Sequence, residues 1–111
     1  MKFTTTNAAG TVEILAATGF VAIPIKVTET GVVPAGTPLT AAGAKSEDGT
    51  GAAGILLYDV DTEANPNGAI VVQGVINQRK AEAHAGVTYS ASALKTAVPG
   101  IVLRNNVGVN A

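Results

Sequence analysis

The chain has 111 residues, of which 47% are hydrophobic and only 14% are charged, and its net charge is −1. This length favours a single domain, and the sparse, balanced charge argues against the basic surface with which proteins bind nucleic acid. Cysteine is absent, which excludes disulfide bonds, a thiol nucleophile and a cysteine-ligated zinc site. No apolar run reaches the roughly 18 residues that a membrane span requires, so we expect neither nucleic acid nor a membrane as a partner.

The hydrophobic content predicts that the protein works in an assembly. An average domain has about 25% charged residues, well above the 14% found here. A small domain has little interior, so its many valine, isoleucine and alanine side chains cannot all be hidden in one core. Because contiguous apolar surface usually marks an interface, we expect a homo-oligomer or docking onto a larger body.

The polar start of the chain differs from the rest. Residues 1–11 are rich in Thr, Asn and Ala without any periodicity, and we expect them to form an extended N-terminal arm. Residues 12–111 are expected to form a single β-rich domain, which could begin with a short strand at Val12–Ala16.

The clearest periodic signal lies in Phe20–Val27. One face of this segment carries four β-branched residues at period two, Val21, Ile23, Ile25 and Val27. This alternation predicts a half-buried strand. Pro24 cannot donate a ladder hydrogen bond, so the strand should lie at a sheet edge or contain a bulge there.

Two turn-rich stretches follow. Gly31–Thr40 contains two prolines and two glycines, and we expect only short extended pieces in it, at Val32–Val33 and Pro38–Thr40. Ala41–Ala53 lacks periodicity and is long for a connection, which predicts a loop that leaves the domain surface.

Two strongly apolar segments come next, Ile55–Val60 and Ala69–Ile76, with an Asn67–Gly68 turn signal before the second. Both are apolar on each of their faces. Strands of this kind are covered twice, and we expect one cover to be the domain's own core and the other to be a second body. The polar segment Asn77–Ala85 should continue the strand or form a loop.

The segment Ser90–Val98 is the one short helix predicted. Ser90 can cap it, Ala and Leu favour it, and Pro99–Gly100 ends it. Ile101–Arg104 should form a final strand. The predicted fold class is therefore mainly β: a small, compact, barrel-like or β-clip-like domain with long loops and one short helix.

Two glycine-containing motifs resemble nucleotide-binding sequences only superficially. Gly49–Gly54 matches G-x-G-x-x-G, but the dinucleotide site needs a strand before the motif and a helix after it. Here a polar loop precedes the motif and a strand follows, so we expect a loop. Gly43–Ser46 is not a P-loop, because its lysine does not follow glycine directly.

The polar residues offer little catalytic or metal-binding chemistry. Asp59, Asp61 and Glu63 alternate and could face one cation such as calcium, although the favoured interpretation is a strand end entering solvent. His84 is the sole histidine. The remaining candidates are the serines that a triad would need and a carboxylate pair: Ser46, Ser90 and Ser92, and Glu63 with Glu82. The serines lack a G-x-S-x-G setting, so no catalytic, cofactor-binding or metal site is predicted, and no enzyme.

Four short segments between Gly31 and Arg104 carry a resemblance. They are Val33–Thr40 (VPAGTPLT), Ala53–Asp61 (AGILLYDVD), Gly68–Gly74 (GAIVVQG) and Leu94–Ile101 (LKTAVPGI). Each is a small apolar sequence that many β domains could contain. In this order and spacing, they resemble the head-decoration and head-fibre base proteins of tailed phages.

This resemblance implies a structural function. It implies a mostly β subunit, often a homotrimer, that binds the major capsid protein on the outside of the phage head and stabilises the shell without catalysis. The protein would be made in the host cytoplasm and would reside on the virion exterior. By position alone, the arm at residues 1–11 would pair with the capsid. The alternatives are a small ligand- or carbohydrate-binding β module, against which the shortage of Trp and Tyr argues, and a small hydrolase.

Overall fold

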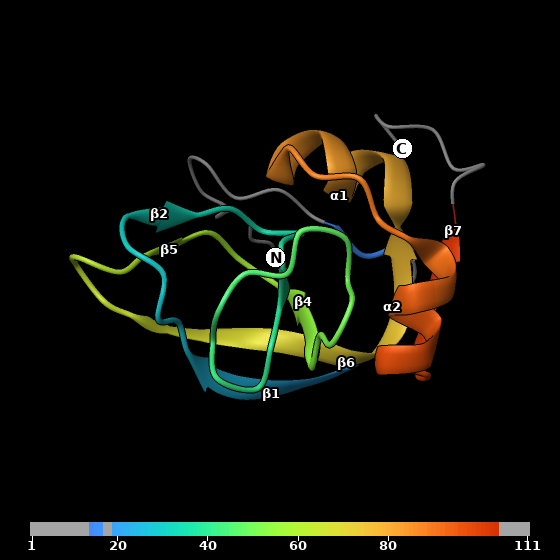
Figure 1. The fold of residues 1–111 in the computed structure, drawn as a ribbon, viewed down its shortest axis with the longest axis horizontal. Helices are drawn as coiled ribbons and strands as arrows, with labels where there is room; N and C mark the ends of the chain where they lie inside the picture. The colour runs from blue at the N-terminus through green and yellow to red at the C-terminus, as the bar shows by residue number, and fades with distance from the viewer. Residues whose placement is uncertain (1–13, 17–18, 105–111) are drawn as a thin grey trace, which may run out of the picture.

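Seven strands and two helices make up the part of the chain that the structure, a computed structural model, describes: residues 14–16 and 19–104 (Figure 1). In chain order they are β1 (Val21–Lys26), β2 (Val32–Val33), β3 (Pro38–Leu39), β4 (Gly54–Leu56), β5 (Val60–Asp61), β6 (Asn67–Asn77), α1 (Gln78–Ala85), α2 (Ala91–Ala97) and β7 (Ile101–Arg104). The predicted arm at residues 1–11 lies outside the described residues, so the division into arm and domain stays a prediction.

The long strand β6 organises the main sheet. β1 pairs with it antiparallel along one edge, while β4 pairs antiparallel and β7 parallel along the other, and β3 adds to β4. Leu15 forms an isolated antiparallel bridge with Ile76, so the described part of the segment expected as a strand, residues 14–16, contains a single bridge and no strand. β2 and β5 form a separate two-stranded sheet. The mainly β prediction is confirmed, and the main sheet is open rather than closed into a barrel.

A second helix corrects the expectation for Asn77–Ala85. The Asn77 side chain accepts a hydrogen bond from the Lys80 backbone N–H, which caps the start of α1, and Gly86 ends it in the left-handed conformation with φ 71°. Only Ala81 of this helix is buried, so the segment has no apolar stripe for periodicity to detect. α2 begins after the Ser90 cap as predicted.

The apolar segment Ile55–Val60 is not one strand. β4 ends at Leu56, and a break precedes β5 at Val60. The two pieces join different sheets, because β4 pairs with β6 whereas β5 pairs with β2. The run of apolar residues predicted burial correctly but could not show the bend between the two sheets.

Both faces of β4 and β6 are covered by the chain itself. Ile55 and Val71 belong to a first core, which α1, α2 and the segment between them help to form. Leu56 and Ile70, which alternate with them, belong to a second core with Val27, Val33, Leu39 and Val60. The expectation that these strands need a second body is therefore wrong for most of their length, because the separate sheet of β2 and β5 supplies the second cover.

β1 is the edge strand that Pro24 predicted, and Figure 1 shows it beside β6 with no labelled element beyond it. A bulge is also present, but it lies between Val21 and Ala22 rather than at Pro24. No helix in the described residues is long and apolar enough to cross a membrane.

Candidate functional site

The predicted apolar row on β1 is buried along only half of its length. Val27 is 2% exposed, and Ile25 packs against the second core. Val21 and Ile23, in contrast, are 47% and 44% exposed. The expectation of one continuous buried row is therefore wrong, because the second core ends before it reaches the first residues of the strand.

Strand register shows which other side chains share this face. Residues directly opposite each other on neighbouring strands lie on the same face of a sheet. Ile23 is opposite Ile70, which is in the second core. The extra residue at the β1–β6 bulge is Val72, which is partly buried and packs against the same core. The uncovered end of β1 thus lies on the second-core side of the sheet, next to Val72.

The same side of the sheet continues onto β7. Ile76 and Leu103 are register partners that face the first core. Val75 and Val102, each one residue earlier, are also partners, so they point to the other side. Val102 is 50% exposed. We call the resulting set the open apolar face: Val21, Ile23, Val72, Val75 and Val102.

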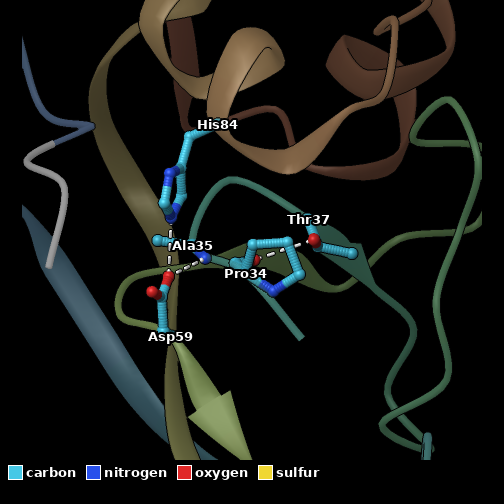
Figure 2. A network of polar contacts seen from close by, with 5 residues as sticks. All are labelled: Pro34, Ala35, Thr37, Asp59 and His84. Atoms are coloured by element: carbon cyan, nitrogen blue, oxygen red, sulfur yellow. Dashed lines mark hydrogen bonds and ion pairs between the residues drawn. The ribbon is translucent and has the colours of Figure 1, made fainter. Parts of the chain in front are cut away.

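A polar network ties α1 to the turn after β2 (Figure 2). The Oδ1 atom of Asp59 accepts a hydrogen bond from the Ala35 backbone N–H at 2.8 Å and lies 2.7 Å from His84 Nε2. In the same turn, the Thr37 hydroxyl donates to the Pro34 carbonyl at 2.8 Å. Asp59 and His84 are 25 residues apart in sequence, and no local pattern signals that they meet.

The same turn is held from a second point on the helical side. The Tyr89 hydroxyl donates to the Gly36 carbonyl, and a Cβ atom added to Gly36 would lie 2.7 Å from the Ala81 carbonyl oxygen. Burial raises the pKa of the Tyr89 hydroxyl, and the negative charge of Glu82 raises it further. The close approach of α1 explains why glycine is needed at position 36.

A histidine beside a carboxylate is also the arrangement that orients a general base, so the candidate nucleophiles matter. The Ser46 hydroxyl accepts from the Gly49 N–H and donates to the Thr50 carbonyl. Ser90 caps α2. Ser92 lies on α2 and lines a hollow of about 470 Å³ with residues such as Thr50 and Thr96. That hollow has no aromatic or charged lining residue.

The three alternating carboxylates, Asp59, Asp61 and Glu63, differ in their contacts and do not converge on one point. Asp59 holds Ala35 and His84, Asp61 accepts a hydrogen bond from the Glu63 backbone N–H at 3.1 Å, and Glu63 is exposed. Within residues 14–16 and 19–104, no group of three or more histidine or acidic side chains is placed to hold a metal ion. Glu82, the other carboxylate considered, accepts from the Tyr89 backbone N–H at 2.8 Å and from the Gln78 side chain.

The glycine motifs are structural. Gly49 is buried with φ 103°, and an added Cβ would lie 3.0 Å from the Leu94 side chain. Gly54 begins β4, so the motif leads into a strand and the loop prediction is confirmed. We expected the loop Ala41–Ala53 to leave the domain surface. It packs onto the domain instead, since Gly43, Ser46, Gly49 and Ala52 are buried.

Comparisons with models of protein families, with curated proteins and with solved structures find no match to this chain. Among the described residues, the open apolar face has the character of an interaction surface, because Val21, Ile23 and Val102 are about half exposed on one face of the sheet. Sequence periodicity identified its β1 members but predicted them to be buried.

Proposed function

We propose that this chain is a structural, non-catalytic subunit that decorates the outside of a tailed-phage head and stabilises its shell as a homo-oligomer, with a trimer favoured. The observation that supports the proposal is the open apolar face, where Val21, Ile23 and Val102 are about half exposed. Large apolar surface of this kind is a common feature of interaction sites. The order of the four segments that resemble decoration proteins supplies the identity of the partner.

The chemistry of the polar side chains fits a structural subunit. Asp59, His84, Ser46 and Glu82 bond to the fold itself, so their polar groups hold loops and helices in place. Stabilisation of a shell would come from apolar burial, at about 25 cal/mol for each Å² removed from water. Strand pairing by the arm at residues 1–11 is a second expected contribution.

The test is binding to shells assembled from the major capsid protein encoded in the same genome. Expanded, undecorated shells are mixed with the protein and sedimented, and the melting temperature of the shell is measured. We expect saturable co-sedimentation and a higher melting temperature. The absence of both effects at micromolar protein would contradict the proposal.

Deletion of residues 1–11 separates the arm from the domain. The truncated protein should keep the circular dichroism spectrum of the full chain but lose most of its shell binding. Unchanged binding would show that the arm is not a contact. Binding to a glycan array in place of the shell would support the carbohydrate-binding alternative.

A further inference from the structure

We infer that the open apolar face is the contact surface between copies of this chain, so that the face is buried in a homo-oligomer before any shell is bound. The inference deepens the proposed function, on which it rests for the existence of an assembly. The starting observation is that both faces of β4 are covered by the chain itself, while the first half of β1 is not.

The face has almost no charge, which suits a second copy. β6 contains no charged residue over its whole length, and the only charge on β1 is Lys26. Lys26 is opposite Asn67, one residue away from the Ile25–Gly68 pair, so it lies on the opposite side of the sheet from Ile25. Arg104 stands at the end of β7. A surface with an uncharged centre can face its own copy without placing like charges together.

The edge of β1 is less suited to association than its face. Pro24 has no N–H to donate to a neighbouring strand, and the bulge between Val21 and Ala22 interrupts the regular ladder. Proline and bulges are features that protect sheet edges from pairing. Sheets also associate through their faces, with the backbones about 10 Å apart and branched side chains interdigitating. The exposed side chains of Val21 and Ile23 fit this mode.

The size of the face is that of an interface centre. Five residue steps separate Ile70, opposite Ile23, from Val75, so this part of β6 spans at most about 17 Å. A standard interface takes about 800 Å² from each partner, roughly a seventh of the 5661 Å² surface of the chain. Interfaces also contain polar side chains among their apolar ones, and on this face exposed Gln73, which is opposite Val21, is polar but uncharged. A second copy is also present wherever the protein is, at the same concentration.

The test is the molar mass of the protein in solution, measured by light scattering and sedimentation velocity from 1 to 100 µM. We expect an oligomer for the natural chain. Ile23→Lys should raise the dissociation constant about 100-fold or more, because each copy would then bury an unpaired charge. Val32→Lys is the matched control, because Val32 is 64% exposed but lies on β2 in the other sheet, and it should keep the oligomer.

Ile23→Thr is a milder second variant that retains the β-branched shape and guards against loss of the fold. Far-UV circular dichroism checks that each variant is folded. A natural chain that is monomeric at 100 µM would overturn the inference, as would folded Ile23→Lys and Ile23→Thr variants that keep the full oligomer. Shell binding is measured in parallel. An oligomer that does not bind shells would contradict the proposed shell binding but not this inference. A monomer that binds shells would contradict this inference and the proposed homo-oligomer, but not the proposed shell binding.

Discussion

At the scale of single residues, Asp59 is the side chain on which the turn after β2 depends. Its carboxylate satisfies the Ala35 N–H and contacts His84. Removing it leaves a partly buried donor without its partner, whereas removing His84 loses only one partly exposed contact between two side chains. We therefore expect Asp59→Ala to lower the free energy of unfolding by about 1–3 kcal/mol, and His84→Ala by about 1 kcal/mol or less.

Urea unfolding followed by circular dichroism measures both changes. Asp61→Ala is the control, because Asp61 is an exposed neighbour whose carboxylate accepts a local hydrogen bond from the Glu63 backbone N–H. If Asp61→Ala were as destabilising as Asp59→Ala, the contact with Ala35 would not be the cause.

The raised pKa of the Tyr89 hydroxyl predicts that the protein loses stability at alkaline pH. Its folded-state pKa is raised above the ordinary value of 10.0, first by burial and then by Glu82. Since the folded state holds the phenolic proton more tightly than the unfolded state, this stabilisation is complete below pH 10 and falls as the pH rises above it. The midpoint of urea unfolding should therefore fall from pH 9 to pH 11.5.

Tyr89→Phe should reduce that fall, while costing about 1 kcal/mol at neutral pH because the Gly36 carbonyl loses its donor. Tyr58 is 54% exposed, and Tyr58→Phe should leave the alkaline fall unchanged. Equal behaviour of the two variants would show that lysine titration, and not Tyr89, causes the effect.

At the scale of elements, β6 requires a glycine at position 74, where its pairing with β7 begins after its pairing with β4 has ended. Gly74 has φ 151°, and an added Cβ would lie 2.9 Å from the Cβ of Phe20. Gly86, at the end of α1, also has a positive φ, of 71°, but has open space around it. Gly86→Ala should therefore cost about 1 kcal/mol from conformation alone, and Gly74→Ala clearly more. Thermal unfolding of the two variants measures the difference, and equal losses would contradict the steric explanation.

The elements also show where the sequence was informative. β1 and β6 were predicted from alternation and from long apolar runs, and the capped α2 from Ser90 and Pro99. α1 was missed because Ala81 is its single buried residue, so it depends on its Asn77 cap and on packing beside Gly36. The division between β4 and β5 was missed because apolar residues on both sides of a bend look like one strand.

At the scale of the whole molecule, an apolar contact between copies predicts a characteristic response to salt. Charged contacts weaken as ionic strength rises, because the screening length falls from about 10 Å at 0.1 M to about 3 Å at 1 M. Apolar burial does not depend on that screening. The molar mass at 10 µM should therefore stay constant between 0.1 and 1 M sodium chloride, and dissociation at high salt would indicate an ionic interface instead.

The sequence by itself determined that the protein is mainly β, that β1 and β6 are strands, and that more apolar side chains are present than a single core needs. These properties follow from local alternation and composition. Only the tertiary structure decided how the apolar residues are divided. It placed one core on each face of the main sheet, so that Ile55 and Leu56 are both buried, and it left Val21 and Ile23 uncovered. The reason is that alternation reports which side chains share a face, whereas the cover of that face comes from segments far away in the chain.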